Sequence, residues 1–373
     1  MRRWWRVGTG LALSLLYVAA QAGPLPNYAA IPIFIADGDT TRLVAGGINN
    51  LGDVVGTRYV ASGSAGFVYR GGVTSWLPQL AGPGTTAAAI NDAGDIVYDA
   101  TSADGWRHAV LYRNGQVTDL APGEQRSTGV WAISQSGQHI VGAAPCAACG
   151  GRDGAVSFDG QGGVHPVGTF GGASRALSVN DAGQAVGFAY REGDPSARAV
   201  LFENGAMTDL GDFGGNIGSA MDINRFGAIV GTADDADHVA HAFLYQDGVM
   251  TDLGSLYPGR SAAATALSDT GLVVGLTTYA SNGDTPFIWR AGVMTDLNTL
   301  LDPVYGWRID DVRDINDAGQ IAAHGCNAAL DVCGVLRLDP LSPVPEPGAY
   351  AMLAAGLLVL GRFARRRRGS KAV

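Results

Sequence analysis

Four cysteines are the residues of this chain whose spacing most directly suggests chemistry. Cys146 and Cys149 form a CxxC pair, and Cys326 is followed by Cys333. A CxxC pair can bind zinc or carry redox chemistry, but no βαβ pattern surrounds it, and a shared zinc site would have to join two pairs far apart in the sequence. In an oxidising compartment we instead expect two local disulfides, Cys146–Cys149 and Cys326–Cys333. Zinc and redox chemistry are the alternatives.

Two clusters of aspartates are the other candidate ligands. Asp234, Asp235 and Asp237 lie in one acidic segment, and Asp310, Asp311 and Asp314 form a second cluster. Calcium takes about six to eight oxygen ligands, so the first cluster is a candidate calcium site, although neither matches an EF-hand loop. The alternative is that both are solvated acidic loops. No other cofactor is expected.

Catalytic motifs are missing from residues 23–343. This stretch contains no HExxH, GxSxG, P-loop or dinucleotide-binding fingerprint. His108 and His241 occupy one position of a repeated sequence, and Thr-Asp-Leu recurs at 118–120, 208–210, 251–253 and 295–297. The repeat explains these residues better than catalysis does. We expect the aspartates to face solvent or to bind neighbouring backbone, rather than to form the carboxylate pair of a glycoside hydrolase.

Tryptophans are the remaining candidates for ligand contact. Five of them lie in different units of the repeat, namely Trp76, Trp106, Trp131, Trp289 and Trp307. A sugar ring can stack on an exposed tryptophan, but packing in the core is the commoner use of this side chain.

A repeat must position all of these residues. Its copies begin at Ile48, Ile90, Ile133, Val179, Ile223, Leu267 and Ile315, with steps of 42 to 48 residues. About 40 to 50 residues is the length of one four-stranded propeller blade. Within a unit, Asp247-Gly248 between apolar runs predicts a tight hairpin, and Asn-Asp-Ala-Gly at 180–183 predicts a type I turn.

The ends of the repeat favour a closed ring. The last unit lacks a fourth strand, and residues 31–35 form a strand without partners. Each end therefore supplies what the other lacks, and closure leaves no exposed sheet edge. We predict an all-β fold over residues 23–343, a seven-bladed β-propeller of four-stranded antiparallel blades closed by N-terminal and C-terminal strands. A ring of six or eight blades is the next alternative.

Residues 1–22 predict a secretory signal peptide. Arg2, Arg3 and Arg6 precede an uncharged run from residue 7 to 19, and Ala20-Gln21-Ala22 provides a small-x-small cleavage site. The run is shorter than the roughly 20 apolar residues of a spanning helix. We therefore expect an exported protein.

Residues 344–373 form a tripartite tail. Val344, Pro345, Glu346 and Pro347 precede an apolar stretch, 349–360, and arginines at 365–368. Arginines hold such a segment on the cytoplasmic side. The tail resembles the PEP-CTERM sorting signal of Gram-negative bacteria. The resemblance implies a hydrophobic sorting helix inserted transiently in the inner membrane, removal by an exosortase, and delivery by the secretion machinery to the cell surface or an exopolysaccharide matrix. A plain transmembrane anchor is the alternative.

The repeat itself resembles a family of extracellular bacterial proteins named for a His-Ala-Phe signature, the HAF repeat. His241-Ala242-Phe243 matches in full, and His108-Ala109-Val110 is a degenerate copy. The resemblance implies fold and export, and it names no activity.

Charge excludes one class of partner. Between the basic ends, residues 23–347 hold 16 of the 25 Lys and Arg residues and all 34 Asp and Glu residues, a net charge of −18. Nucleic-acid binding needs a basic patch, so no nucleic-acid partner is expected.

Two functions remain open. In the first, the propeller is a non-catalytic binding or structural module whose partner is a polysaccharide or a surface protein. In the second, it is an extracellular carbohydrate-active enzyme, a lyase or hydrolase, with carboxylates at the mouth of its channel. Fold alone cannot decide between them. Carboxylates converging with a His or Tyr in one pocket would favour the enzyme.

Overall fold

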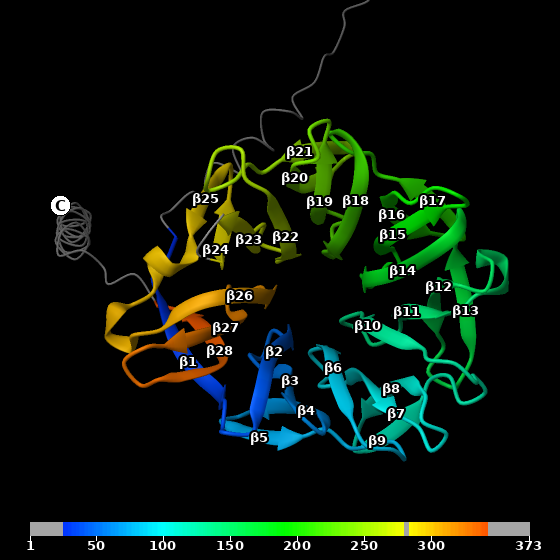
Figure 1. Ribbon diagram of the computed structural model, residues 1–373, viewed down its shortest axis with the longest axis horizontal. Coiled ribbons are helices and arrows are strands. Elements are labelled where there is room, and N and C mark those ends of the chain that lie inside the picture. Colours follow the sequence, from blue (N-terminus) through cyan, green and yellow to red (C-terminus); the bar gives the residue numbers. More distant parts are fainter. Residues whose placement is uncertain (1–24, 280–282, 342–373) are drawn as a thin grey trace, which may run out of the picture.

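The computed structural model describes residues 25–279 and 283–341, which form a ring of seven four-stranded antiparallel sheets (Figure 1). This confirms the predicted seven-bladed propeller. The signal peptide, residues Val344 to Pro347 of the sorting motif and the expected C-terminal helix lie outside the described residues. Within the described part, no helix is long and apolar enough to cross a membrane.

Each blade runs from an inner strand at the channel to an outer strand at the rim. The first three blades are β2 (Thr40–Ile48), β3 (Val54–Val60), β4 (Gly63–Arg70) and β5 (Val73–Trp76); β6 (Thr85–Ile90), β7 (Ile96–Thr101), β8 (Arg107–Arg113) and β9 (Gln116–Asp119); and β10 (Gly129–Ile133), β11 (Ile140–Pro145), β12 (Asp153–Phe158) and β13 (Val164–Gly168). They are called blades 1 to 3.

Blades 4 to 6 repeat this order. They are β14 (Gly171–Val179), β15 (Ala185–Arg191), β16 (Ala197–Glu203) and β17 (Ala206–Asp209); β18 (Gly214–Ile223), β19 (Ile229–Asp235), β20 (Ala240–Gln246) and β21 (Val249–Asp252); and β22 (Ala262–Leu267), β23 (Val273–Tyr279), β24 (Gly283–Arg290) and β25 (Val293–Asp296). Short 3-10 helices η1 (Ala147–Cys149), η2 (Leu297–Leu300) and η3 (Pro303–Tyr305) lie in the connecting loops.

Blade 7 combines the two ends of the repeat. It contains β26 (Arg308–Ile315), β27 (Ile321–Asn327), β28 (Val332–Pro340) and, as its outer strand, β1 (Tyr28–Ile35). β1 pairs antiparallel with β28, from Tyr28 opposite Pro340 to Ile35 opposite Gly334. The predicted closure is confirmed, and the closing strand begins three residues before the predicted residue 31.

The turns adopt the backbone that their sequences require. In the hairpin between β20 and β21, Asp247 has φ 53° and Gly248 φ 80°, as a type I′ turn demands. In the turn between β14 and β15, the Gly183 N–H donates to the Asn180 carbonyl at 3.0 Å. These two kinds of turn share one face of the ring, which we call the turn face.

Apolar contacts between adjacent blades form the core. Phe67, Phe243 and Phe287 occupy one position of the third strand and are fully buried. Each ring lies against a glycine of the second strand: a Cβ on Gly275 would meet the Phe287 ring at 2.7 Å. The inner strand is closer still, since a Cβ on Gly142, Gly187, Gly231 or Gly275 would meet one of its backbone carbonyl oxygens at 1.9–2.1 Å. This close approach explains why the repeat keeps a glycine at this position.

Buried asparagines also join the blades. The Asn at the start of a turn donates its Nδ2 to the equivalent backbone carbonyl of the next blade, at 2.8–3.4 Å, from Asn49, Asn91, Asn180, Asn224 and Asn316. The other two blades have Ser134 and Ser268 at this position. A serine hydroxyl is too short to reach across, so the ladder of asparagines is interrupted twice.

The structure pairs the cysteines locally. In the loop between β11 and β12, Cys146 directly precedes η1 and Cys149 is its last residue, with the two sulfur atoms 2.08 Å apart. Cys326 and Cys333 face each other across β27 and β28, with sulfur atoms 2.02 Å apart. Both pairs lie between the second and third strands of their blades. The oxidised state of the exported protein stays a prediction.

Deleting Tyr28–Ile35 should destabilise the whole propeller. The deletion removes the partner of β28 and the buried side chains of Tyr28, Ala30 and Ile33. Losing even one large core side chain costs about 2–5 kcal/mol, so we expect a fall of well over 10 °C in Tm, or no folding. Calorimetry measures this, with deletion of Gly23 and Pro24 as the control. Equal melting temperatures would refute closure.

Asn180→Ser should remove one link between blades 4 and 5. The serine keeps a hydroxyl for the turn, as Ser268 does towards the Leu272 N–H. The Asn224 carbonyl, however, loses the donor from the neighbouring blade and keeps only the Gly227 N–H of its own turn. We expect a loss of about 1–2 kcal/mol in the free energy of unfolding. The converse change, Ser268→Asn, should stabilise by about 1 kcal/mol. Denaturant titration measures both, and an unchanged Asn180→Ser variant would refute the ladder.

Candidate functional site

The central channel is the candidate site. The inner strands of all seven blades face one another around the axis of the ring (Figure 1). They line a cavity of about 420 Å³. Its walls are inner-strand residues, and its mouth on the turn face is formed by the residues that begin each turn.

Each inner strand carries a β-bulge at the same place. A bulge inserts one extra residue and redirects its side chain. Here the bulge residues line the channel, and they differ from blade to blade, namely Gly46, Ala88, Trp131, Leu177, Met221, Thr265 and Arg313. The backbone of the inner strand is therefore the same in every blade, whereas the side chain that it places in the channel differs from blade to blade.

Two carboxylates also break the repeat inside the channel. The position after the bulge holds a small residue in five blades, and it holds Asp222 in blade 5 and Asp314 in blade 7. Asp222 accepts hydrogen bonds from Ser178 Oγ at 2.7 Å and from the Leu267 N–H at 2.9 Å. It thus connects blades 4, 5 and 6.

Asp314 connects the last blade to the first. Its Oδ2 accepts from the Ile48 N–H and its Oδ1 from the Ile315 N–H, both at 2.8 Å. Burial raises the pKa of Asp314 to about 7, and the nearby Asp222 carboxylate contributes to the rise. Burial also raises the pKa of Asp222, against the hydrogen bonds that it accepts. The channel therefore holds a carboxyl that gains or loses a proton near neutral pH.

Polar side chains form a second ring at the mouth. The second residue of the turn lines it in six blades, namely Asn50, Gln135, Asp181, Arg225, Asp269 and Asp317. Asp92 occupies the equivalent position in the turn of blade 2. A backbone N–H of one blade donates to the side-chain oxygen of the next in six of the seven steps among the described residues, at 2.7–3.1 Å. The interruption falls between blades 4 and 5, where Arg225 offers no acceptor.

The acidic segments do not form a metal site in the described residues. No group of three or more His, Cys, Asp or Glu side chains there is placed to hold an ion. Asp235 instead accepts from the N–H groups of Asp237 and Val239, both at 2.9 Å, and contacts His241 Nε2 at 3.1 Å. The geometry thus gives the Asp235 side chain a role in shaping this loop. It lends no support to the calcium hypothesis for Asp234, Asp235 and Asp237, which stays a prediction.

The second acidic cluster is divided between different partners. Asp310 contacts His324 at 2.6 Å, Asp311 contacts Arg313 at 2.8 Å, and Asp314 lies on the channel wall. Of the three, only Asp314 belongs to the candidate site.

The repeated histidines and aspartates pair with each other away from the channel lining. His108 Nδ1 lies 2.8 Å from Asp119 Oδ2, and His241 Nδ1 lies 2.9 Å from Asp252 Oδ2. The second oxygen of each aspartate accepts a backbone N–H two residues later, in Ala121 and Gly254. These residues join the third strand to the fourth, as the repeat suggested.

The tryptophans are dispersed. Trp131 lines the channel, and the Arg175 guanidinium stacks on it at 5.3 Å. Trp76 packs against Phe34 and Phe67, while Trp289 and Trp307 pack against the core. The structure does not bring the five tryptophans together into one platform.

Sequence reasoning missed Asp222, Ser178 and the ring of bulge residues. A signal for Asp222 exists: Asp-Ile-Asn occurs at 222–224 and 314–316, where the other repeats begin with Gly, Ala or Ser. Aligning the seven repeats column by column would have shown both aspartates as departures.

Comparison with known proteins identifies the tail. The PEP-CTERM protein-sorting motif matches residues 343–368. The motif implies an exported protein that passes through the membrane towards the cell surface after processing by an exosortase. No curated protein sequence matches the chain.

Comparison with solved structures supports the fold alone. The β-propeller domain of the trilobed protease from Pyrococcus furiosus aligns with TM-score 0.55 and 10% identity, covering 82% of this chain and 99% of that one. A puromycin-hydrolyzing peptidase from Mycobacterium tuberculosis gives 0.54 and 14%, covering 87% and 58%. An acylaminoacyl peptidase from Pyrococcus horikoshii gives 0.52 and 10%, covering 77% and 50%. The chain thus spans about half the length of these two peptidases.

The trilobed-protease domain is described as having an open velcro topology. In the present chain, β1 closes blade 7 by pairing with β28. The likeness therefore extends to the propeller and does not extend to the way in which the ring is closed.

The Asp314 carboxyl should titrate near pH 7. Because its pKa is raised on folding, protonation favours the folded state, so its contribution to stability is greatest below about pH 4 and is lost as the pH rises through 7. Carbon NMR of labelled aspartates should show a titration near pH 7 that is missing in Asp314→Asn. The titration of Asp99, whose pKa burial raises to about 6, should remain in that variant. Asp222→Asn should lower the Asp314 midpoint by removing a neighbouring charge. A midpoint that stays near 4 in the wild type would contradict this electrostatic account.

Proposed function

We propose that this protein is an exported propeller, associated with the cell surface or an exopolysaccharide matrix, that acts as a non-catalytic binding or structural module with its ligand in the central channel. The observation that carries the proposal is the ring of bulge residues. A purely structural repeat has no need for seven different side chains at one position, whereas a binding site for an asymmetric ligand does.

The chemistry of the ring suits a polyhydroxyl ligand such as a sugar. Trp131 offers an aromatic surface for stacking, and Thr265 and Ser178 supply hydroxyls beside the Asp222 and Asp314 carboxylates. Arg313, held by Asp311 at 2.8 Å, adds a donor. Residues 23–347, which we call the body, have a net charge of −18 and therefore repel polyanions. A neutral or amine-bearing polysaccharide thus fits better than an acidic one. A HAF-type repeat from a Gram-negative source is consistent with this use.

A carbohydrate-active enzyme is the second candidate, because two carboxylates with raised pKa values line one channel. Binding is favoured for two reasons. Both oxygens of each carboxylate already accept backbone N–H groups. In addition, the described residues that line the channel include no His or Tyr to complete an acid–base pair.

Delivery is part of the same proposal. The signal peptide starts export, the tail inserts transiently in the inner membrane, and an exosortase with the secretion machinery releases the body near residues 344–347. Disulfides at Cys146–Cys149 and Cys326–Cys333 would hold two exposed loops after export, and the protein needs no other cofactor.

Trp131→Ala should abolish polysaccharide binding. We expect the mature body to bind one class on a panel of immobilised neutral, amino and acidic polysaccharides, and the variant to lose at least tenfold in affinity. Trp106→Ala, which alters an exposed tryptophan outside the channel, is the matched control. Runs with and without calcium test an ion requirement.

Two outcomes would contradict the binding proposal. Equal losses from Trp131→Ala and Trp106→Ala would exclude the channel. Release of shortened saccharides by the wild type, abolished in Asp314→Asn, would favour the enzyme.

A further inference from the structure

Both described ends of the chain lie on the turn face. In the other six blades a tight hairpin joins the third strand to the fourth on this face; in blade 7 those strands are β28 and β1, so two chain ends take the place of the hairpin. The Leu341 N–H donates to the Asn27 carbonyl at 2.7 Å. A Cβ on Gly319, in the turn of blade 7, would lie 4.0 Å from Pro340. The described chain therefore ends, at Leu341, on the turn face, and the sorting tail follows this residue in the sequence.

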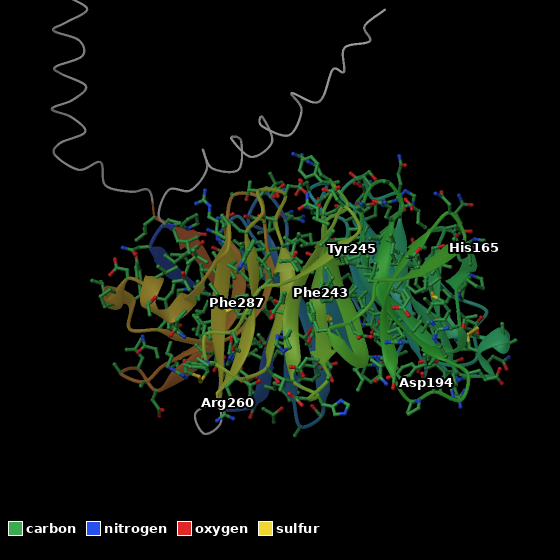
Figure 2. All side chains as sticks on the ribbon, turned by 90° about the horizontal axis from the view of Figure 1, so that it is seen from above. His165, Asp194, Phe243, Tyr245, Arg260 and Phe287 are labelled. Carbon is green, nitrogen blue, oxygen red and sulfur yellow. A yellow bond between two sulfur atoms is a disulfide. The ribbon has the colours of Figure 1, made fainter. Side chains whose placement is uncertain are left out.

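The same face carries exposed apolar side chains. Leu51 and Phe226 stand at the tips of turns with exposed fractions of 71% and 66%. Val73, Val249 and Val293 begin the outer strands of their blades, directly after the hairpins, and are 62–63% exposed. Figure 2 shows the ring from the side, with Asp194 and Arg260, from loops of the opposite face, along its lower edge.

The tether between the body and the apolar segment is short. Seven residues, 342–348, separate Leu341 from the apolar stretch that starts at Ala349. At no more than about 3.6 Å per residue, they reach at most roughly 29 Å. The nine residues of β28 are separated by eight steps and span about 26 Å at 3.3 Å per residue, before the loops on either face are counted. A fully extended tether would therefore be used up in running down the side of the propeller, whereas the turn face is already beside the point where the tether begins.

We propose that the turn face lies against the lipid bilayer while the tail is inserted, with Leu51, Phe226 and the three valines contacting the lipid surface. The occupant of this face is the bilayer that holds the tail. This inference concerns orientation, and it goes beyond the ligand proposed for the channel. Since the channel mouth opens on the same face, the bilayer covers it in the tethered precursor, and removal of the tail exposes it.

The charged side chains of the turn face determine which lipid headgroups it can contact. Asp181 and Asp317 line the mouth, whereas Arg225 is paired with Asp269 at 3.1 Å. The arginines Arg70 and Arg113 on this face are likewise held by aspartates, at 2.7 and 2.8 Å. Contact should therefore be stronger on zwitterionic than on anionic membranes.

Fluorescence quenching in vesicles tests the orientation. The chain that keeps its tail is reconstituted in phosphatidylcholine vesicles that carry a nitroxide-labelled lipid. A fluorophore is attached to Ala182→Cys, at an exposed turn tip, or to Ala236→Cys, in an exposed loop of the opposite face. We expect quenching several-fold stronger at position 182 than at 236, and weaker at 182 when phosphatidylglycerol is added.

A long-linker control isolates the tether. Inserting twenty Gly and Ser residues after Leu341 should reduce the difference between the two positions, since such a linker is flexible.

Leu51→Ser with Phe226→Ser should reduce quenching at 182 with unchanged circular dichroism. Equal quenching at 182 and 236 in the chain of natural length would overturn the proposal. This experiment uses no polysaccharide. Its outcome is therefore independent of whether the propeller released from its tail binds a polysaccharide, and each proposal can be refuted without the other.

Discussion

The pairing of β1 with β28 is the interaction on which the rest of the structure depends. Without it the ring would end in two open sheet edges, and blade 7 would have no outer strand. Polar contacts reinforce the same junction. Asn316 Nδ2 donates to the Asn49 carbonyl at 2.8 Å, and Arg337 donates to the Gly52 carbonyl at 2.9 Å. Asp314 binds the Ile48 N–H across it. Blade 7 is thus joined to blade 1 as firmly as any other neighbouring pair.

Closure also defines the channel, because the cavity exists only while all seven inner strands face one another. Asp314 contributes to both, since it joins blade 7 to blade 1 and also lines the channel. Its burial disfavours the charged carboxylate and so raises the pKa of Asp314. A small residue would avoid that cost, as Ala89 and Ala132 do at the same position. The two aspartates therefore depart from the repeat in two ways, since they join neighbouring blades and also line the channel.

Much of the fold could be predicted because it rests on local chemistry. Asp247-Gly248 and Asn180 with Gly183 specify their turns, and the unpartnered strand near residue 31 indicated closure. The bulges could not be predicted, because they depend on the register between two strands. The alternation of apolar and polar residues along each inner strand shows almost no trace of them. Asp222 was missed for a related reason: it stands out only when it is compared with the small residue that five other repeats have at the same position. The aspartates at 234–237 looked like ion ligands because sequence does not show that Asp235 is occupied by its own loop.

Amide hydrogen exchange of the released body tests ring closure most directly. If β1 closes the ring, its amides should exchange only through global unfolding, with the same opening free energy as the inner strands β2 and β26. If β1 is an accessory strand, its amides would exchange at a lower opening free energy, while β2 and β26 keep full protection. That result would contradict the account.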